Sequence, residues 1–253
     1  MRALIALLTD FGHDDPYAGV MRGVLLSRAP RARLVDLCHG VPRHDIRAAA
    51  LHLRSALPYY PENTLFVCVV DPGVGSRRAL LWARGRRHTY LAPDNGLLTL
   101  AAEADPFREV RSLTARGLWL KDPSPTFHGR DVFAPTAAAL ACGLPPARLG
   151  PRKSSFIRLP WPKPRRRGGR LAGEVVLIDR FGNAVTNLSG EGLRARALRA
   201  RGVRAPLVSC YADARRGAPL AVVGSYGFVE LSIREGSFAA STGIRVGEAV
   251  YAG

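Results

Sequence analysis

The sequence predicts an α/β N-terminal domain with a mainly parallel sheet, followed by an all-β, barrel-like C-terminal domain. Three observations support this fold class. Apolar strand-like runs alternate with helical segments up to residue 143, which is the pattern of α/β domains. Short strand-like runs separated by turns follow from residue 171, which is typical of a small barrel or sandwich. Between them, the segment 159–170 (LPWPKPRRRGGR) holds three prolines and two glycines without an apolar period.

We therefore expect an α/β domain over residues 1–160, a linker over 161–170 and a barrel domain over 171–253. A chain of 253 residues is long enough for two such domains. Its hydrophobic fraction of 47% is sufficient for a sizeable core in each.

The strands expected in the first domain are short apolar runs that end in polar loops. A buried parallel strand reads as such a run. The runs lie within residues 3–12, 33–39, 63–75, 78–84 and 88–96.

Helical segments separate most of these runs. They cover residues 14–29, 44–60, 96–104 and 130–143. We expect Asp14 or Asp15 as the N-cap of the first helix with Pro16 at its first position. Gly143 is expected to close the last helix. In the second helix the residues expected on one apolar face are Ile46, Ala49, Ala50, Leu53 and Leu57.

The second domain is expected to be almost entirely strands. Its strand-like runs lie within residues 171–180, 183–189, 206–212, 219–233 and 244–251. Residues 190–202 alone have a helical pattern in this half of the chain.

The chain is strongly basic, but the distribution of its charge argues against a nucleic-acid binder. The formal net charge is +17, which is typical of proteins that bind nucleic acid. Of 37 basic residues, three are lysines (Lys121, Lys153 and Lys163), so the other 34 are arginines. Most are scattered, and the dense cluster is confined to 163–170. We attribute this composition to coding bias and do not expect nucleic acid as a partner.

The cysteine pattern indicates a reduced compartment. The four cysteines are far apart and form no C-x-x-C pair, so a zinc ribbon is not indicated. Cys68, in the apolar run LFVCVV, is expected to be a buried free thiol. The first apolar run is too short for a signal sequence, and no run approaches the length of a membrane span. We expect a cytoplasmic protein without a membrane partner.

Three strands of the first domain end in an aspartate followed closely by glycine, in TDFG, VDPGVG and APDNG. Ligands of open α/β sheets bind outside the carboxyl ends of the strands. We therefore expect Asp10, Asp71 and Asp94 to share one rim. Each motif alone is also typical of an ordinary turn.

Two further motifs carry candidate catalytic groups. Arg78 follows Asp71 closely, and an arginine keeps a neighbouring carboxylate ionised. His128, in TFHGRD, lies ahead of a helix and is a candidate acid or base. The alternatives are an ordinary turn ion pair, a structural histidine and, for Asp131, a helix cap.

The second domain repeats the same pattern in IDRFGNAVTN. Asp179 and Asn183 are placed to bind a ribose or an amino acid, and a plain β-turn is the alternative. In GSYGFVELSIREGS, Tyr226 and Phe228 belong to the core or stack on a base.

The residues alone leave two classes of enzyme open. One is a metal-dependent phosphohydrolase acting on nucleotides, since carboxylates and a histidine are ligands of hard divalent metals. Its ligands would come from Asp10, Asp14, Asp15, Asp71, Asp94 and His128. The other binds a nucleoside at the same rim without a metal.

Taken together, the motifs resemble those of the S-adenosyl-L-methionine (SAM) hydroxide adenosyltransferases, relatives of the SAM-dependent chlorinases and fluorinases. They are LLTDFG, CHGVPRHDIRAAA, VVDPGVGSRR, LAPDNGLL, TFHGRDVFAPTAA, IDRFGNAVTN and GSYGFVELSIREGS, in this order from near the start to about residue 251. The resemblance implies hydrolysis of SAM to adenosine and L-methionine without a metal or other cofactor. It also implies a homotrimer, with SAM bound between the N-domain of one subunit and the C-domain of its neighbour.

The resemblance also implies roles for single residues. Asp71, Arg78 and His128 match the trio of the hydrolytic members, which the halogenating members replace, and we expect these three to fix the attacking water. Asp10 matches a ribose-binding aspartate. The other residues implied in substrate binding are Asn95, Asp179, Phe181, Asn183, Ser225, Tyr226 and Arg234.

Two positions depart from the family pattern. Gly224 stands where the family often has asparagine, and His44 stands where fluorinating members have a tryptophan over the ribose. Both departures affect individual ligand contacts and leave the implied reaction unchanged.

Overall fold

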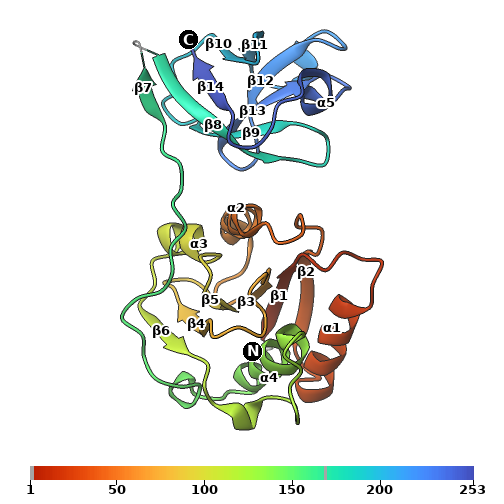
Figure 1. Cartoon of the computed structure of the whole chain (residues 1–253), viewed down its shortest axis with the longest axis vertical. Coiled ribbons are helices and arrows are strands. Elements are labelled where there is room, and N and C mark those ends of the chain that lie inside the picture. Colours follow the sequence, from red (N-terminus) through yellow and green to blue (C-terminus); the bar gives the residue numbers. More distant parts are fainter. Residues whose placement is uncertain (1–2, 168–169) are drawn as a thin grey trace. The chain divides into compact units, whose positions relative to one another are not determined.

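The structure is a computed structural model that describes residues 3–167 and 170–253. The chain divides into two compact units, Met1–Leu159 and Pro160–Gly253 (Figure 1). Arg165–Arg167 form strand β7, so the segment 161–170 that was expected to be a linker is partly strand. Gly168 and Gly169, part of the same expected linker, lie outside the described residues.

The first unit is built on a mixed sheet that is parallel around its centre. Its strand order is β2-β1-β3-β5-β4-β6. The first four strands in this order run parallel to one another, whereas β4 is antiparallel to both of its neighbours, β5 and β6. The strands are β1 (Leu4–Thr9), β2 (Arg33–Cys38), β3 (Leu65–Val69), β4 (Leu80–Arg84), β5 (Thr89–Pro93) and β6 (Glu109–Ser112).

Two helix layers cover this sheet (Figure 1). Helices α1 (Tyr17–Arg28) and α4 (Ala134–Ala141) pack on each other, and their buried side chains join those of β1 and β3 in one core cluster. Helices α2 (Ile46–Ala56) and α3 (Thr99–Ala104) pack on each other at the opposite face. Cys68 is buried as a free thiol in β3, as predicted.

Several helix ends differ from the sequence prediction. Helix α1 begins at Tyr17 after Pro16, and neither Asp14 nor Asp15 caps it. Helix α2 begins at Ile46, because His44 has a left-handed backbone (φ 63°) and Asp45 supplies the cap, its Oδ1 accepting from the Ala48 N–H at 2.8 Å.

The entry to α4 is also different. Residues Gly129–Phe133 form a wide helical turn with i→i+5 hydrogen bonds ahead of α4. Asp131 lies inside this turn, where its carboxylate accepts from the Ser124 N–H at 2.8 Å and pairs with Arg130, so its predicted role as a cap is wrong. Such wide turns occur often at functional sites. Gly143 follows the C-cap Cys142 with φ 94°, close to the predicted end.

The second unit is a closed antiparallel-rich barrel. Among its described residues the ring runs β14-β10-β11-β12-β13-β9-β8 and closes through the β14–β8 pairing, with β7 added on β8. The strands are β8 (Arg170–Ile178), β9 (Ala184–Ser189), β10 (Ala197–Ala200), β11 (Val203–Val208), β12 (Pro219–Val223), β13 (Phe228–Ile233) and β14 (Ala249–Ala252). Inward side chains form its own core cluster.

The helix expected over 190–202 is wrong. This stretch contains β10, which a turn at Arg201 (φ 50°) and Gly202 (φ 76°) joins to β11. Two positive φ angles in succession are what a tight hairpin requires. Helical elements here are limited, within the described residues, to α5 (Phe238–Thr242) and the short turn Tyr211–Asp213. In the first unit, short turns also occur at Leu57–Tyr59, Arg116–Leu118 and Pro146–Arg148.

No helix in the described part of the chain is both long enough and apolar enough to cross a membrane.

Candidate active site

A pocket of about 390 Å³ lies at the carboxyl ends of the parallel strands in the first unit. Asp10 follows β1 and Asp71 follows β3 by two residues, and these strands are neighbours in the sheet. Both aspartates line the pocket together with His44 and His128. The sequence prediction of a shared rim is therefore confirmed for Asp10 and Asp71.

Asp94, the third aspartate of the predicted rim, does not line this pocket. It is buried, its Oδ1 accepts from the Ile157 N–H at 2.7 Å, and its Oδ2 lies 3.6 Å from the Lys153 Nζ. Its carboxylate therefore holds residues 153–157, which follow α4, in place.

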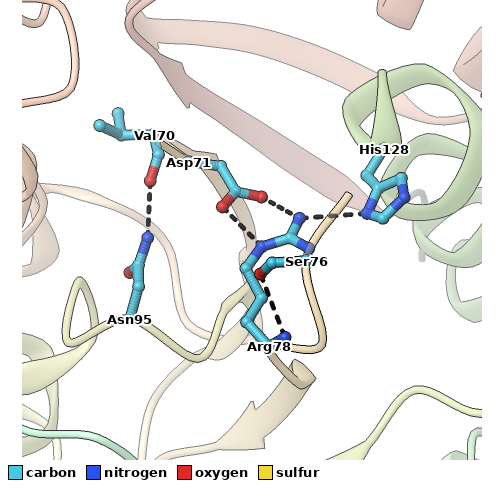
Figure 2. Close-up of polar contacts among 6 residues, drawn as sticks. All are labelled: Val70, Asp71, Ser76, Arg78, Asn95 and His128. Atoms are coloured by element: carbon cyan, nitrogen blue, oxygen red, sulfur yellow. Dashed lines mark hydrogen bonds and ion pairs between the residues drawn. The ribbon is translucent and has the colours of Figure 1, made fainter. Parts of the chain in front are cut away.

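Asp71, Arg78 and His128 form one hydrogen-bonded network (Figure 2). Arg78 grips the Asp71 carboxylate with two donors, Nε to Oδ1 at 2.6 Å and Nη2 to Oδ2. The same Nη2 lies 3.1 Å from Nδ1 of His128. The Asp71 and Arg78 side chains are 5% and 8% exposed, so the pair is shielded from solvent. Arg78 does not line the pocket, whereas its two partners do.

This network determines the protonation of His128. A guanidinium can only donate, so Nδ1 of His128 must accept, and the neutral ring carries its proton on Nε2. Burial lowers the pKa of His128, and the positive charge of Arg78 lowers this pKa further, against the opposing charges of Asp71 and Asp131. His128 is therefore neutral at pH 7 and offers Nε2–H as a donor.

Two backbone features bring the network together. The loop after β3 approaches the segment before His128 so closely that a Cβ at Gly75 would lie 2.7 Å from the Pro125 carbonyl oxygen. Gly75 also has φ 80°, which disfavours any other residue. The VDPGVG motif thus carries Arg78 to within reach of His128.

Asn95 steadies the end of β3. Its Nδ2 donates to the Val70 carbonyl oxygen at 2.9 Å (Figure 2). Its Oδ1 accepts from the Leu97 N–H at 3.2 Å. Val70 immediately precedes Asp71, so Asn95 positions the loop that carries Asp71. A direct contact of Asn95 with substrate stays a prediction.

Asp10 is oriented by the helix entry that the sequence analysis placed differently. Its Oδ2 accepts from the His44 N–H at 2.9 Å, and the left-handed backbone of His44 directs that N–H towards it. The His44 side chain lines the same pocket.

In the second unit, Asp179 and Asn183 form the turn that was considered as the plain alternative. Oδ1 of Asp179 accepts from the Phe181 N–H at 2.9 Å and the Asn183 N–H at 2.8 Å, and its Oδ2 accepts from Asn183 Nδ2 at 2.9 Å. The turn leaves the Phe181 ring 77% exposed. A fixed polar turn beside an exposed ring suits a ligand contact, and that contact stays a prediction.

Ser225 and Tyr226 lie in the turn between β12 and β13, and Arg234 follows β13. Arg234 Nη1 donates to the carbonyl oxygens of Ala212 and Ala214 at 3.0 and 2.8 Å. These bonds fix the adjoining turn and use part of the guanidinium, and contact of Arg234 with substrate stays a prediction.

Glu230 in β13 is a buried carboxylate that the sequence pattern did not single out, and Tyr211 contacts it. A Cβ at Gly224 would lie 1.8 Å from Glu230 Oε1, so the Glu230 carboxyl fills the space of the missing side chain. Burial raises the pKa of Glu230, and so does the charge of Asp179, while the Tyr211 hydroxyl donates to Glu230 Oε2 at 3.0 Å and lowers this pKa. The sequence does contain a signal for this buried carboxylate, because Glu230 interrupts the apolar run FVELSI. That run was predicted only to be part of a strand.

Over residues 3–167 and 170–253, no three histidine, cysteine, aspartate or glutamate side chains lie close enough to hold a metal ion. Two of the carboxylates proposed as ligands have basic partners, with Asp71 on Arg78 and Asp94 near Lys153. This donor set does not fit the metal-dependent alternative.

Sequence models of one family match both units. The model described as the SAM hydroxide adenosyltransferase N-terminal domain matches residues 5–150, and the corresponding C-terminal domain matches residues 173–251.

Individual relatives agree with this match. A Thermus thermophilus protein named (R)-S-adenosyl-L-methionine hydrolase is 42% identical and aligns with 96% of each chain. A fluorinase from an Actinoplanes species is 29% identical over 90% of each chain. A crystal structure of an uncharacterized conserved protein from Thermotoga maritima, 33% identical, superposes with a TM-score of 0.91 over 98% of both chains.

The network predicts the titration of His128. Replacing Arg78 with methionine removes a positive charge beside the ring, and we expect the pKa of His128 to rise. NMR titration of the His128 ring protons measures this, with Arg77→Met as a control that removes a neighbouring exposed arginine. A His128 pKa that moves equally in both variants would contradict the contact.

Proposed function

The chain belongs to the SAM hydroxide adenosyltransferase family, and on that premise we propose that it hydrolyses SAM to adenosine and L-methionine. The observation that carries the proposal is the buried Asp71–Arg78–His128 network beside the pocket. The names of the relatives specify the (R) epimer at sulfur, and we propose the same epimer for this chain.

The reaction needs an oriented nucleophile more than it needs a stabilised leaving group. A water oxygen forms a bond to C5′ of the ribose while the C5′–S bond breaks. The electron pair of the C5′–S bond stays on sulfur. The sulfonium thus leaves as the neutral thioether of methionine. The water gives up one proton to the protein and then to solvent. Positioning and partial desolvation of this water lower the barrier.

The network assigns different tasks to its members. Asp71 is the ionised group at the pocket and accepts the proton of the water. His128 donates its Nε2–H to the water oxygen and so fixes its direction. Arg78 holds both side chains and favours the hydroxide-like form through its charge. Its Nη1 is buried without a hydrogen-bond partner among the described residues, so this nitrogen is still able to donate to a ligand or a water.

The water-using reaction is preferred over halogenation because the trio is present. Relatives named fluorinase align along most of the chain, so the overall fold does not separate the two reactions. In the metal-dependent phosphohydrolase alternative, Asp71 would be a metal ligand, and its pairing with Arg78 disfavours that role.

Three further properties belong to this proposal. We infer a homotrimer whose site is shared between subunits, activity without a metal, and a cytoplasmic location. Family membership supports the trimer. The neutral leaving group supports metal independence, because no negative charge on it needs a metal. The free cysteines support a reduced compartment.

Purified protein incubated with SAM, with and without a chelator, tests the reaction by chromatography. We expect adenosine and methionine in equal amounts and unchanged by the chelator. Activity on nucleotides that the chelator abolishes would instead favour the phosphohydrolase.

Removing the water-fixing groups should reduce turnover. We expect His128→Ala and Asp71→Ala each to lower kcat by about 10²–10⁴-fold, because each supplies or directs a proton transfer. Adenosine affinity should change much less. Asp14→Ala is the matched control, an exposed aspartate outside the pocket lining. Near wild-type kcat in both variants would exclude the proposed water trio.

Asp10→Ala should mainly weaken nucleoside binding. A hydrogen bond from a ribose hydroxyl to a carboxylate contributes about 1.5–3 kcal/mol, so adenosine should bind roughly 10–100-fold more weakly. Calorimetry with adenosine measures this, again with Asp14→Ala as the control. An unchanged dissociation constant would rule out the ribose contact.

A further inference from the structure

We propose that Phe11, Tyr17 and the carboxylate of Asp15 bind the sulfonium cation of the substrate. All three line the pocket that contains Asp71 and His128. The inference rests on the proposed function, and it identifies how the site distinguishes SAM from the uncharged thioether of S-adenosylhomocysteine.

Three aromatic rings form a cluster at this wall of the pocket. The Tyr17 and Phe127 ring centres are 5.3 Å apart with an interplanar angle of 89°, and those of Phe11 and Phe127 are 5.7 Å apart at 78°. Phe11 and Tyr17 are 5.8 Å apart at 56°. The rings meet edge to face or tilted, so ring faces remain outside the cluster.

One of these rings already holds a cation. The Arg130 guanidinium carbon lies 5.1 Å from the centre of the Phe127 ring. Arg130 is in turn paired with Asp131, which keeps it there. This leaves the rings of Phe11 and Tyr17 for a ligand cation.

Packing alone does not account for Tyr17. Phe11 and Phe127 pack against the core cluster of the first unit, whereas Tyr17 is not among the residues of that cluster. Its side chain lies at the first position of α1 and is 46% exposed. An exposed tyrosine beside a polar pocket is placed for ligand contact.

The charges of the pocket support a cation at this wall. Asp71 is neutralised by Arg78, and Asp10 is held by the His44 N–H. Asp15 also lines the pocket and, contrary to the sequence prediction, does not cap α1. Arg43 and His44 line the pocket as well, so net charge alone does not select a cation. The ring faces of Phe11 and Tyr17, together with the Asp15 carboxylate, select a cation at this wall of the pocket.

A sulfonium group needs this kind of environment. It carries positive charge but has no N–H or O–H to donate, so neither carbonyl nor hydroxyl groups can bind it by ordinary hydrogen bonds. Aromatic faces and a nearby carboxylate attract such a cation directly. The charge on sulfur disappears as the C5′–S bond breaks, so this attraction is stronger in the bound substrate than in the transition state. Removing it should therefore raise KM without lowering kcat.

The test compares two ligands that differ in one methyl group and one charge. Dissociation constants for SAM and S-adenosylhomocysteine are measured by calorimetry in a His128→Ala background, which slows turnover. Tyr17→Leu is expected to weaken SAM binding by about 2–30-fold, the range of a cation–π contact, and to change S-adenosylhomocysteine binding less than twofold. Tyr17→Phe should keep the wild-type ratio of the two constants. Tyr59→Leu is the control, a tyrosine that is 77% exposed and outside the pocket lining.

A second pair of variants tests the carboxylate independently of ring packing. Asp15→Asn should weaken SAM selectively, and the adjacent exposed Asp14→Asn should not. Equal losses for SAM and S-adenosylhomocysteine in Tyr17→Leu, or unchanged ratios in both Tyr17→Leu and Asp15→Asn, would overturn the inference. Adenosine formation by the wild-type protein is measured in parallel. If the wild-type protein forms adenosine normally, these binding results overturn the sulfonium site alone. If it forms no adenosine, the proposed function and this inference are both overturned.

Discussion

The hydrogen-bonded network at the pocket depends on the two-donor contact between Arg78 and Asp71. A shielded ion pair is costly to desolvate, so it persists only where both charges are fully matched. Here the guanidinium satisfies the carboxylate with two of its nitrogens and uses one of them again for Nδ1 of His128. One arginine thereby fixes both side chains and helps to lower the pKa of His128. The site therefore presents an acceptor and a donor to the same pocket.

The fold brings these groups together through the order of its strands. β1 and β3 are adjacent and parallel although about 55 residues separate them in sequence, so Asp10 and Asp71 emerge at one edge. His128 arrives from a different direction, just ahead of the wide turn before α4. The glycine at position 75 allows the close approach that joins the two parts. The chemistry is thus assembled from three separate segments on a rigid sheet.

Sequence reasoning was most reliable where a single physical period dominates. The buried strands around Cys68 and Leu7 are continuous apolar runs, and the α/β and barrel organisation followed from them. It failed where the outcome depends on distant partners. Residues 190–202 were read as helix from their sequence pattern, but they contain β10 and a hairpin turn in which Arg201 has a positive φ. Asp131 was read as a cap although Ser124 and Arg130 occupy its carboxylate.

The same distinction holds for the candidate site. Resemblance located Asp71, Arg78 and His128, but only the three-dimensional contacts reveal that Arg78 stands behind the other two. The space left by Gly224 is another example. Without coordinates it was an unexplained departure, and in the structure the Glu230 carboxyl fills it. Tyr17 was taken only as part of a helix start, since nothing in its local sequence points to a pocket.

Hydrolysis in water enriched in ¹⁸O tests the central claim most directly. If water held by the Asp71–Arg78–His128 network attacks C5′, mass spectrometry will find one ¹⁸O in the 5′-hydroxyl of adenosine and none in methionine. Adenosine without the label would contradict attack by solvent at that carbon. A nucleoside product that still carries sulfur would show that a bond other than C5′–S is broken.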